Sequence, residues 1–269
     1  MEDGYSLMAA KTALVLSAGG MFGAYQAGVW RELAASGFQP DMIVGTSVGA
    51  LNGWAIAGGC PPAELIRAWT DPLAGAFLQL RRPLARWRGF FDERSFLKGI
   101  QEWHSRFRPR IPIGIVLTDL VRLRPRLVQT EEITWRHLAA ACAIPLGLPP
   151  AWIDGRCYVD GGLLNAMPLW PASEMGASRA VAVNALPEWP SRLMRAGVRV
   201  VRWIRPQTQP LGALDAIAIV PAAPLGTLGE SVRWNRDASL HWIEQGAVDA
   251  RQALAAGLFG RDSAQRVLQ

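Results

Sequence analysis

Short apolar segments alternate with longer amphipathic segments along most of this chain of 269 residues. Continuous aliphatic runs bounded by turn residues predict buried strands, and apolar residues spaced three and four apart predict helices. Alternation of these two patterns is typical of βαβ units. We therefore expect an α/β fold, a single three-layer α/β/α domain with a mostly parallel sheet, spanning residues 1–269. Its motif-bearing core is expected at about residues 11–185, and residues 186–269 form its C-terminal part.

The expected strands are short, and one pair forms a hairpin around an Asp-Gly turn within residues 151–162. The other expected strands cover residues 12–17, 41–45, 113–120, 127–129, 180–184 and 216–220. The expected helices cover residues 24–35, 47–57, 62–69, 93–107, 133–143 and 237–256.

The composition excludes several classes of protein. Half of the residues are hydrophobic and 19% are charged, which disfavours disorder, collagen and coiled coils. Three cysteines without pair spacing argue for reduced thiols and against a disulfide scaffold or a cysteine-based zinc site. Three histidines also leave little room for histidine-based metal or triad chemistry.

The expected location is the cytoplasm. The first residues contain two acids where a secretory leader needs basic residues, and the apolar run at 12–16 is too short for its core. The uncharged window at 42–63 contains glycines and a Pro-Pro pair and lacks an 18-residue apolar run. We interpret this window as strand, turn and helix.

A glycine-rich turn with the sequence SAGGMFG occupies residues 17–23, between the first expected strand and helix. Glycines at such a turn allow backbone N–H groups to face an anion, although a tight strand-to-helix connection needs them as well. A dinucleotide-binding fingerprint is disfavoured for two reasons. Ala18 stands where that fingerprint requires glycine, and Asp41 precedes the second strand instead of following it.

A second turn, G-T-S-V-G at residues 45–49, also follows a strand and opens a helix. In this context a G-x-S-x-G sequence predicts a nucleophile elbow, with the Ser47 hydroxyl exposed above the helix N-terminus. The Val48 N–H can donate to a developing oxyanion, and Gly19 or Gly20 can supply a second donor. One such donor lowers the barrier to acyl transfer by roughly 3–4 kcal/mol.

Activation of Ser47 requires a base within hydrogen-bond reach. Asp160 ends a strand and precedes two glycines, which favours an open turn carrying a functional acid, although a turn-forming aspartate fits the same pattern. An α/β-hydrolase triad would instead use Ser47, Asp160 and His241 in that order. His241 lies within the pattern of the closing helix, where a packed or surface histidine is expected.

The glycine loop, the G-x-S-x-G turn and the Asp-Gly-Gly turn, in this order and spacing, resemble the patatin-like phospholipases. Residues 12–60 and 138–185 carry the likeness. The resemblance implies a patatin-like fold and a Ser47–Asp160 dyad, with Gly19, Gly20 and Val48 in the oxyanion hole. The residues that would support these motifs are Ala18, Gly23, Gly45, Gly49, Gly161 and Gly162.

The implied reaction is hydrolysis of a fatty-acyl ester in a phospholipid, lysophospholipid or neutral lipid, through an acyl-Ser47 intermediate. No metal or organic cofactor is implied. An aspartate with an ordinary pKa near 4 is a weak base at neutral pH, so the dyad depends on the oxyanion hole and on burial that raises this pKa. Transfer of the acyl group to an acceptor other than water uses the same intermediate and stays open.

Two positions depart from the family pattern. The family's loop usually begins with three glycines and carries Arg or Lys before its last glycine, whereas this chain has Ala18 and Phe22 at those positions. Ala18 fits the turn only with a negative φ. The loss of the basic residue leaves a non-catalytic alternative, a lipid-binding regulator with a degenerate oxyanion loop.

The net charge of +6 rests almost wholly on arginine, because Lys11 and Lys98 are the only lysines. Segments 81–91 and 192–205 place arginines beside aromatic and aliphatic residues, a pattern that predicts peripheral contact with an anionic membrane. A solvated helix face packed on the core explains the second segment equally well. No nucleic acid is expected as a partner, because no recognised binding motif accompanies the charge.

Overall fold

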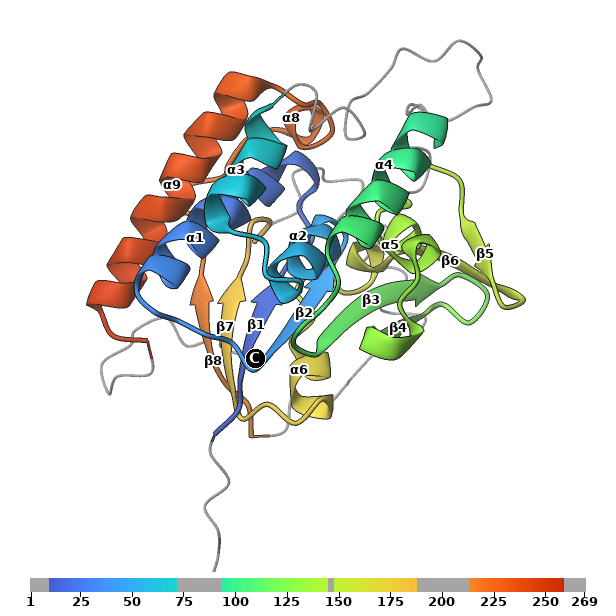
Figure 1. The fold of residues 1–269 in the computed structure, drawn as a ribbon, viewed down its shortest axis with the longest axis horizontal. Helices are drawn as coiled ribbons and strands as arrows, with labels where there is room; N and C mark the ends of the chain where they lie inside the picture. The colour runs from blue at the N-terminus through green and yellow to red at the C-terminus, as the bar shows by residue number, and fades with distance from the viewer. Residues whose placement is uncertain (1–9, 72–92, 145–147, 188–212, 259–269) are drawn as a thin grey trace, which may run out of the picture.

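The computed structural model describes residues 10–71, 93–144, 148–187 and 213–258 (Figure 1). They form one eight-stranded sheet in the order β5-β6-β3-β2-β1-β7-β8, with β4 also beside β3. Strands β8, β7, β1, β2 and β3 are mutually parallel, and β4, β5 and β6 extend the sheet by antiparallel pairing. The strands are β1 (Thr12–Leu16), β2 (Met42–Thr46), β3 (Ile113–Asp119), β4 (Arg124–Gln129), β5 (Ala151–Ile153), β6 (Arg156–Asp160), β7 (Arg179–Val183) and β8 (Asp215–Ile219).

The helices expected from the sequence are present, and two short ones, α6 and α8, are additional. Five and four residues are too few to show helical periodicity, which explains why the sequence pattern did not predict them. The helices are α1 (Gly23–Ala35), α2 (Val48–Ala57), α3 (Pro62–Thr70), α4 (Glu93–Arg106), α5 (Trp135–Ala141), α6 (Trp170–Glu174), α8 (Leu228–Ser231) and α9 (Arg236–Ala255).

Both faces of the parallel strands are buried, as expected for an α/β sheet. On β1, Leu14 belongs to a large core shared with α1, α2 and α9, whereas Val15 belongs to a smaller core on the opposite face. The smaller core includes Leu169, just before α6, and Ala172, within α6. The predicted α/β architecture with a mostly parallel sheet and flanking helices is confirmed.

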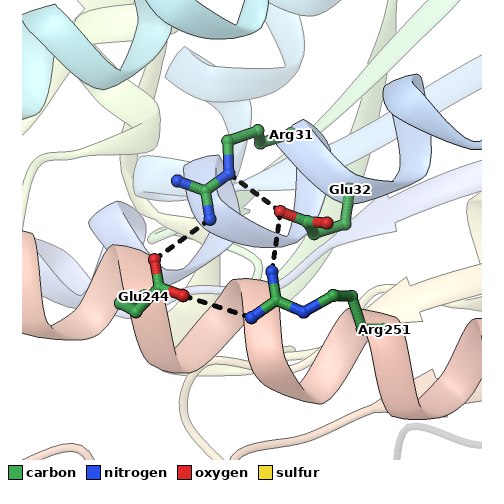
Figure 2. A network of polar contacts seen from close by, with 4 residues as sticks. All are labelled: Arg31, Glu32, Glu244 and Arg251. Carbon is green, nitrogen blue, oxygen red and sulfur yellow. Dashed lines mark hydrogen bonds and ion pairs between the residues drawn. The ribbon is translucent and has the colours of Figure 1, made fainter.

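Helix α9 packs along α1 (Figure 1) through small residues and polar contacts. A Cβ atom on Gly28 would overlap the carbonyl of Ile243, so glycine permits close approach of the two backbones. The Tyr25 hydroxyl donates to Asp249 at 3.0 Å. Figure 2 shows a ring of alternating charges across the same interface, formed by Arg31, Glu32, Glu244 and Arg251.

Strand β3 brings two strand ends together along one of its edges. Thr46, the last residue of β2, pairs with Val116, and Asp160, the last residue of β6, pairs with the next residue, Leu117. Strand β4 occupies the other edge of β3. Because β2 runs parallel and β6 antiparallel to β3, the carboxyl ends of β2 and β6 meet head to head. The residues that follow β2 and end β6 therefore become neighbours.

Candidate active site

Ser47 occupies the sharp turn between β2 and α2. Its backbone has φ 54° and ψ −132°, a conformation that non-glycine residues rarely adopt and that carries a strain of roughly 1–3 kcal/mol. A Cβ atom on Gly45 would overlap the Gly49 backbone, and one on Gly49 would overlap the carbonyls of Leu16 and Ser17. The two glycines of the motif therefore permit the close approach of β1, β2 and α2 that produces this turn.

The Ser47 hydroxyl donates a hydrogen bond of 2.6 Å to Oδ2 of Asp160. Both side chains are buried, with 3% and 5% of their surface exposed, whereas the sequence predicted an exposed Ser47 hydroxyl and an open turn at Asp160. The other carboxylate oxygen, Oδ1, accepts the N–H of Gly162 at 2.7 Å. The Thr118 hydroxyl donates to the Asp160 carbonyl at 3.0 Å, so backbone and side chain are both fixed. The structure thus brings together the serine and the aspartate that the sequence singled out.

The environment changes the acidity of Asp160. Burial raises its pKa from 3.8 to about 7, against the opposing effect of the hydrogen bonds from Ser47 and Gly162. A carboxylate with a pKa near neutrality accepts a proton more readily than one near 4 and is still largely ionised at slightly alkaline pH. Burial therefore gives Asp160 the basicity that a Ser–Asp dyad would need at neutral pH.

The glycine loop lies against both turns. A Cβ atom on Gly162 would lie 2.6 Å from the Cβ of Ala18, which places the start of the loop beside the Asp-Gly-Gly turn. Gly20 has φ 57°, and a Cβ there would overlap the carbonyl of Ser231 in α8. A Cβ on Gly23 would overlap Val48, at the N-terminus of α2. The loop, the elbow and the aspartate turn form one compact site.

The loop and the elbow provide amide groups at two places. The Val48 N–H is the first of α2 and has no intrahelical acceptor, so it is able to donate to an anion beside Ser47. Gly20 opens a short 3-10 helix, Gly20–Phe22, directly after the extended Gly19. The Ala18 N–H, by contrast, donates to the carbonyl of Ala166 at 2.8 Å.

The two departures from the family pattern have structural explanations. Ala18 is not among the described non-glycine residues with positive φ. It therefore has the negative φ that a residue with a side chain needs at this turn. Phe22 is 1% exposed and packs edge-on against Trp242 of α9, with ring centroids 5.0 Å apart. The position that is basic in the family therefore anchors the loop to α9 through an aromatic contact.

A buried polar network behind the loop was not predicted from the sequence. The Gln26 side chain donates to the carbonyl of Ser17 at 2.7 Å, and Asn52 donates to Gln26 at 2.9 Å and to the carbonyl of Gly23 at 3.0 Å. The Trp69 indole N–H donates to Asn52 at 3.1 Å. The available signal was one amide residue among apolar and small residues in α2 and in the first half of α1, and such groups require partners when buried.

None of the three histidines joins the Ser47–Asp160 pair. His241 is exposed on α9, which argues against the predicted alternative of a Ser47–Asp160–His241 triad. Helical periodicity alone did not show which face of the helix this side chain occupies. His104 stacks on Trp54 at 4.7 Å, and His137 caps the N-terminus of α5.

Metal ligands, membrane-spanning helices and arginine-rich segments also figure among the expectations from the sequence. Within the described parts of the chain, no three His, Cys, Asp or Glu side chains are grouped to hold a metal ion. No helix among the described residues is long and apolar enough to span a bilayer. The arginine-rich segments 81–91 and 192–205 lie outside the described residues.

Comparison with known proteins extends the likeness beyond these motifs. A family model described as patatin-like phospholipase matches residues 14–173. Patatin-like phospholipase domain-containing protein 7 of Rattus norvegicus is 31% identical over 205 residues, which cover 71% of this chain and 15% of that protein. Lysophospholipase NTE1 of Mycosarcoma maydis is 30% identical over 181 residues, covering 64% and 9% of the two chains. The chain thus spans a small part of the length of these curated relatives.

The fold is similar to that in the crystal structure of VipD from Legionella pneumophila. The TM-score is 0.51 at 12% sequence identity, over 90% of this chain and 66% of that one. At this identity the likeness concerns the fold alone, whereas the family match includes the loop, the elbow and the aspartate turn. The chain belongs to the patatin-like phospholipase family.

Proposed function

We propose that this protein is a lipid acyl hydrolase in which Ser47 is the nucleophile and Asp160 is the base. The observation that carries the proposal is the 2.6 Å hydrogen bond between these two buried side chains, at an elbow whose serine has a strained backbone. The name lysophospholipase of a relative that is 30% identical supports a lipid ester as substrate. Residues 1–269 would form a single catalytic domain.

The first half of the reaction acylates the enzyme. Asp160 accepts the proton of the Ser47 hydroxyl while Oγ attacks the ester carbonyl carbon. The N–H groups of Val48, Gly19 and Gly20 stabilise the oxyanion that develops on the carbonyl oxygen. The tetrahedral intermediate then breaks the bond to the alcohol oxygen, and Asp160 returns the proton to this leaving oxygen. The products are acyl-Ser47 and a free alcohol, such as a lysophospholipid or a glycerol derivative.

Water completes the cycle by the same groups. Asp160 accepts a proton from a water molecule while the water oxygen attacks the acyl carbon. The bond from this carbon to the Ser47 oxygen then breaks. The proton passes from Asp160 to Oγ of Ser47, which restores the free enzyme and releases a fatty acid. Histidine is not needed, because the carboxylate whose pKa burial has raised is in direct contact with the hydroxyl.

The proposed place of action is the surface of a membrane or lipid droplet, reached from the cytoplasm. The arginine-rich segments 81–91 and 192–205 are candidates for peripheral contact with anionic lipid, on sequence evidence alone. The non-catalytic alternative, a lipid-binding regulator, requires a disabled site. The hydrogen bond between Ser47 and Asp160 argues against this alternative.

Product analysis of a mixed lipid extract tests the proposal. Incubation with the wild-type protein should release free fatty acid together with the matching deacylated lipid, and Ser47→Ala should release neither. Identical product profiles from both proteins would exclude Ser47 as the nucleophile. Acylated acceptors in place of free fatty acid would identify transfer as the reaction.

A further inference from the structure

Three large apolar side chains are exposed where two strand connections project from the sheet. Val121 and Leu120, in the β3–β4 turn, have 74% and 37% of their surface exposed, and Trp152 in β5 has 70%. We refer to these three residues as the tip patch. Single exposed apolar residues are common, but a tryptophan and two aliphatic residues exposed at the same end of the sheet are not explained by core packing.

The backbone pairing places Leu120 and Trp152 in one row across the sheet, with Cys157 between them. The Leu120 N–H donates to the carbonyl of Cys157 at 2.9 Å, and Cys157 is the partner of Trp152 in the β5–β6 pairing. Leu120 and Trp152 are therefore two strand spacings apart, about 10 Å, in one row across the sheet. Figure 1 shows the β5–β6 hairpin and the β3–β4 turn next to each other at one side of the molecule.

The opposite face of the same hairpin is part of the core. Ile153 and Tyr158 are buried there with Leu138 of α5. Since successive residues in a strand point to opposite faces, Trp152 faces away from α5. Trp152 is exposed on this second face, whereas its pairing partner Cys157 is buried there.

Strand register places the tip patch on the catalytic edge of the sheet. Strand β3 is parallel to β2, and Val116 is level with Thr46, the residue before the proposed nucleophile. Leu120 lies four residues further along β3, which corresponds to about 13 Å. The tip patch thus projects beyond the catalytic pair, in the direction in which β2 leads to Ser47.

The charges around the tip patch are mainly positive. Arg122 in the β3–β4 turn and Arg124, the first residue of β4, are exposed, and Arg156 is partly exposed in the hairpin. Arg124 pairs with Asp119 and Arg156 with Ile153, so the register places these two arginines on the α5 face, where they flank the tip patch from the side opposite Trp152. Asp119 is 3% exposed, lies 3.6 Å from Arg122 and accepts the N–H groups of Val121 and Arg122, so it fixes the turn. Asp154 is the exposed acid of this region.

We infer that the tip patch docks the protein on an anionic lipid bilayer, with Trp152 and Val121 in the interfacial layer and the neighbouring arginines at the headgroup phosphates. Tryptophan favours this layer because its ring is apolar while its N–H remains hydrated, and nearby arginines add electrostatic attraction. The inference rests on the proposed function, because a lipid hydrolase must bring its catalytic edge to the bilayer. It concerns residues other than those of segments 81–91 and 192–205.

Vesicle sedimentation of the full chain tests this inference. Vesicles of phosphatidylcholine with added phosphatidylglycerol should bind Val121→Ser/Trp152→Ser at least about tenfold more weakly than wild type. Trp152→Phe should retain most of the binding. The matched control is Val248→Ser, which alters an exposed apolar residue of α9 across the molecule from the hairpin and should bind like wild type.

The arginines provide an independent test. Arg124→Gln and Arg156→Gln should each weaken binding about fivefold at low salt, and the effect should shrink at high salt or on vesicles of phosphatidylcholine alone. All these variants should hydrolyse a short-chain water-soluble ester at the wild-type rate, which also shows that they fold.

The outcomes separate this inference from the proposed function. Wild-type vesicle binding by Val121→Ser/Trp152→Ser would overturn the docking surface, as would hydrolysis of the soluble ester by a wild-type protein that binds no vesicles. A wild-type dimer that the double variant dissociates would assign the tip patch to a second copy of the chain and overturn lipid docking. Vesicle binding that depends on the tip patch, without hydrolysis of any ester, would instead refute the catalytic proposal.

Discussion

Ser47 and Tyr25 each donate a hydrogen bond from the hydroxyl group to an aspartate carboxylate, the first at the elbow and the second between α1 and α9. Ser47 donates to Asp160 at 2.6 Å, where both residues are buried, and Tyr25 donates to Asp249 at 3.0 Å, beside solvent-exposed ion pairs. Burial raises the pKa of both carboxyl groups, for Asp160 to about 7. The contact is chemically the same, and the surroundings differ.

The surroundings determine what each pair can do. Around Ser47 the backbone is strained, and the amide groups at the start of α2 and in the glycine loop are the proposed donors to an oxyanion. Around Tyr25 there is no strained turn, and burial together with the charge of Asp249 raises the pKa of the phenol beyond its usual range. Tyr25 therefore remains a neutral donor that fastens α1 to α9, whereas Ser47 is positioned to react.

Removal of each hydroxyl gives the largest expected contrast. Ser47→Ala should lower kcat/KM for a short-chain ester by roughly 10⁴-fold or more, as in other enzymes that lose a nucleophile. Tyr25→Phe should leave kcat/KM at the wild-type value. Steady-state hydrolysis checks both, with circular dichroism to show that both proteins fold. Activity of Ser47→Ala within tenfold of wild type would remove the elbow from the reaction.

Neutralising each carboxylate gives the next contrast. Asp160→Asn should lower kcat roughly 10³–10⁴-fold, because an amide cannot take the serine proton, whereas Asp249→Asn should leave kcat unchanged. Comparable losses in both variants would contradict the distinction drawn between the two pairs.

Asp160→Asn should also change the thermal stability of the protein, in the direction that the raised pKa of Asp160 predicts. The pKa of Asp160 is higher in the folded protein than its ordinary value of 3.8, so ionising Asp160 destabilises the fold progressively as pH rises from about 4 to about 7. This part of the stability is present below pH 4 and lost above pH 7. Asp160→Asn removes the ionisation and should have a higher Tm than wild type above pH 7, measured by thermal unfolding.

The buried network behind the glycine loop should have a smaller effect on rate. Asn52→Ala removes the donor to the Gly23 carbonyl and leaves Gln26 Oε1 and the Trp69 indole N–H without a partner, which costs about 1–3 kcal/mol of stability. We expect kcat to fall about tenfold with KM nearly unchanged, since the loop carries the proposed oxyanion donors. Rate assays at a temperature where the variant is fully folded test this, with Asn184→Ala as control. An unchanged kcat would make the network purely structural.

The smallest expected effects are at the α1–α9 interface. Tyr25→Phe should lower the free energy of unfolding by about 1 kcal/mol, the usual contribution of one hydrogen bond. Arg251→Ala should cause no resolvable change, because exposed ion pairs such as those in Figure 2 contribute little. Denaturant unfolding measures both. A larger loss for Arg251→Ala would show that the charge ring acts cooperatively.

Much of this fold follows from local sequence patterns, because most strands are short aliphatic runs and most helices have clear periodicity. The turns that carry Ser47 and Asp160 were predictable for the same reason, since glycines mark each of them. Their meeting was not predictable from spacing, because it depends on β6 pairing antiparallel with β3 on the edge that β2 also uses. The long-range contact of Phe22 with Trp242 and the network through Asn52 likewise arise only when distant helices pack.

The most direct test of the central claim is the pH dependence of Ser47 labelling by a fluorophosphonate, measured in wild type and in Asp160→Asn. If Asp160 is the base, the wild-type rate should rise about tenfold per pH unit below the pKa of about 7 and level off above it. Asp160→Asn should label slowly, without this step. A step that persists in Asp160→Asn, or labelling as fast as in wild type, would show that another group activates the serine.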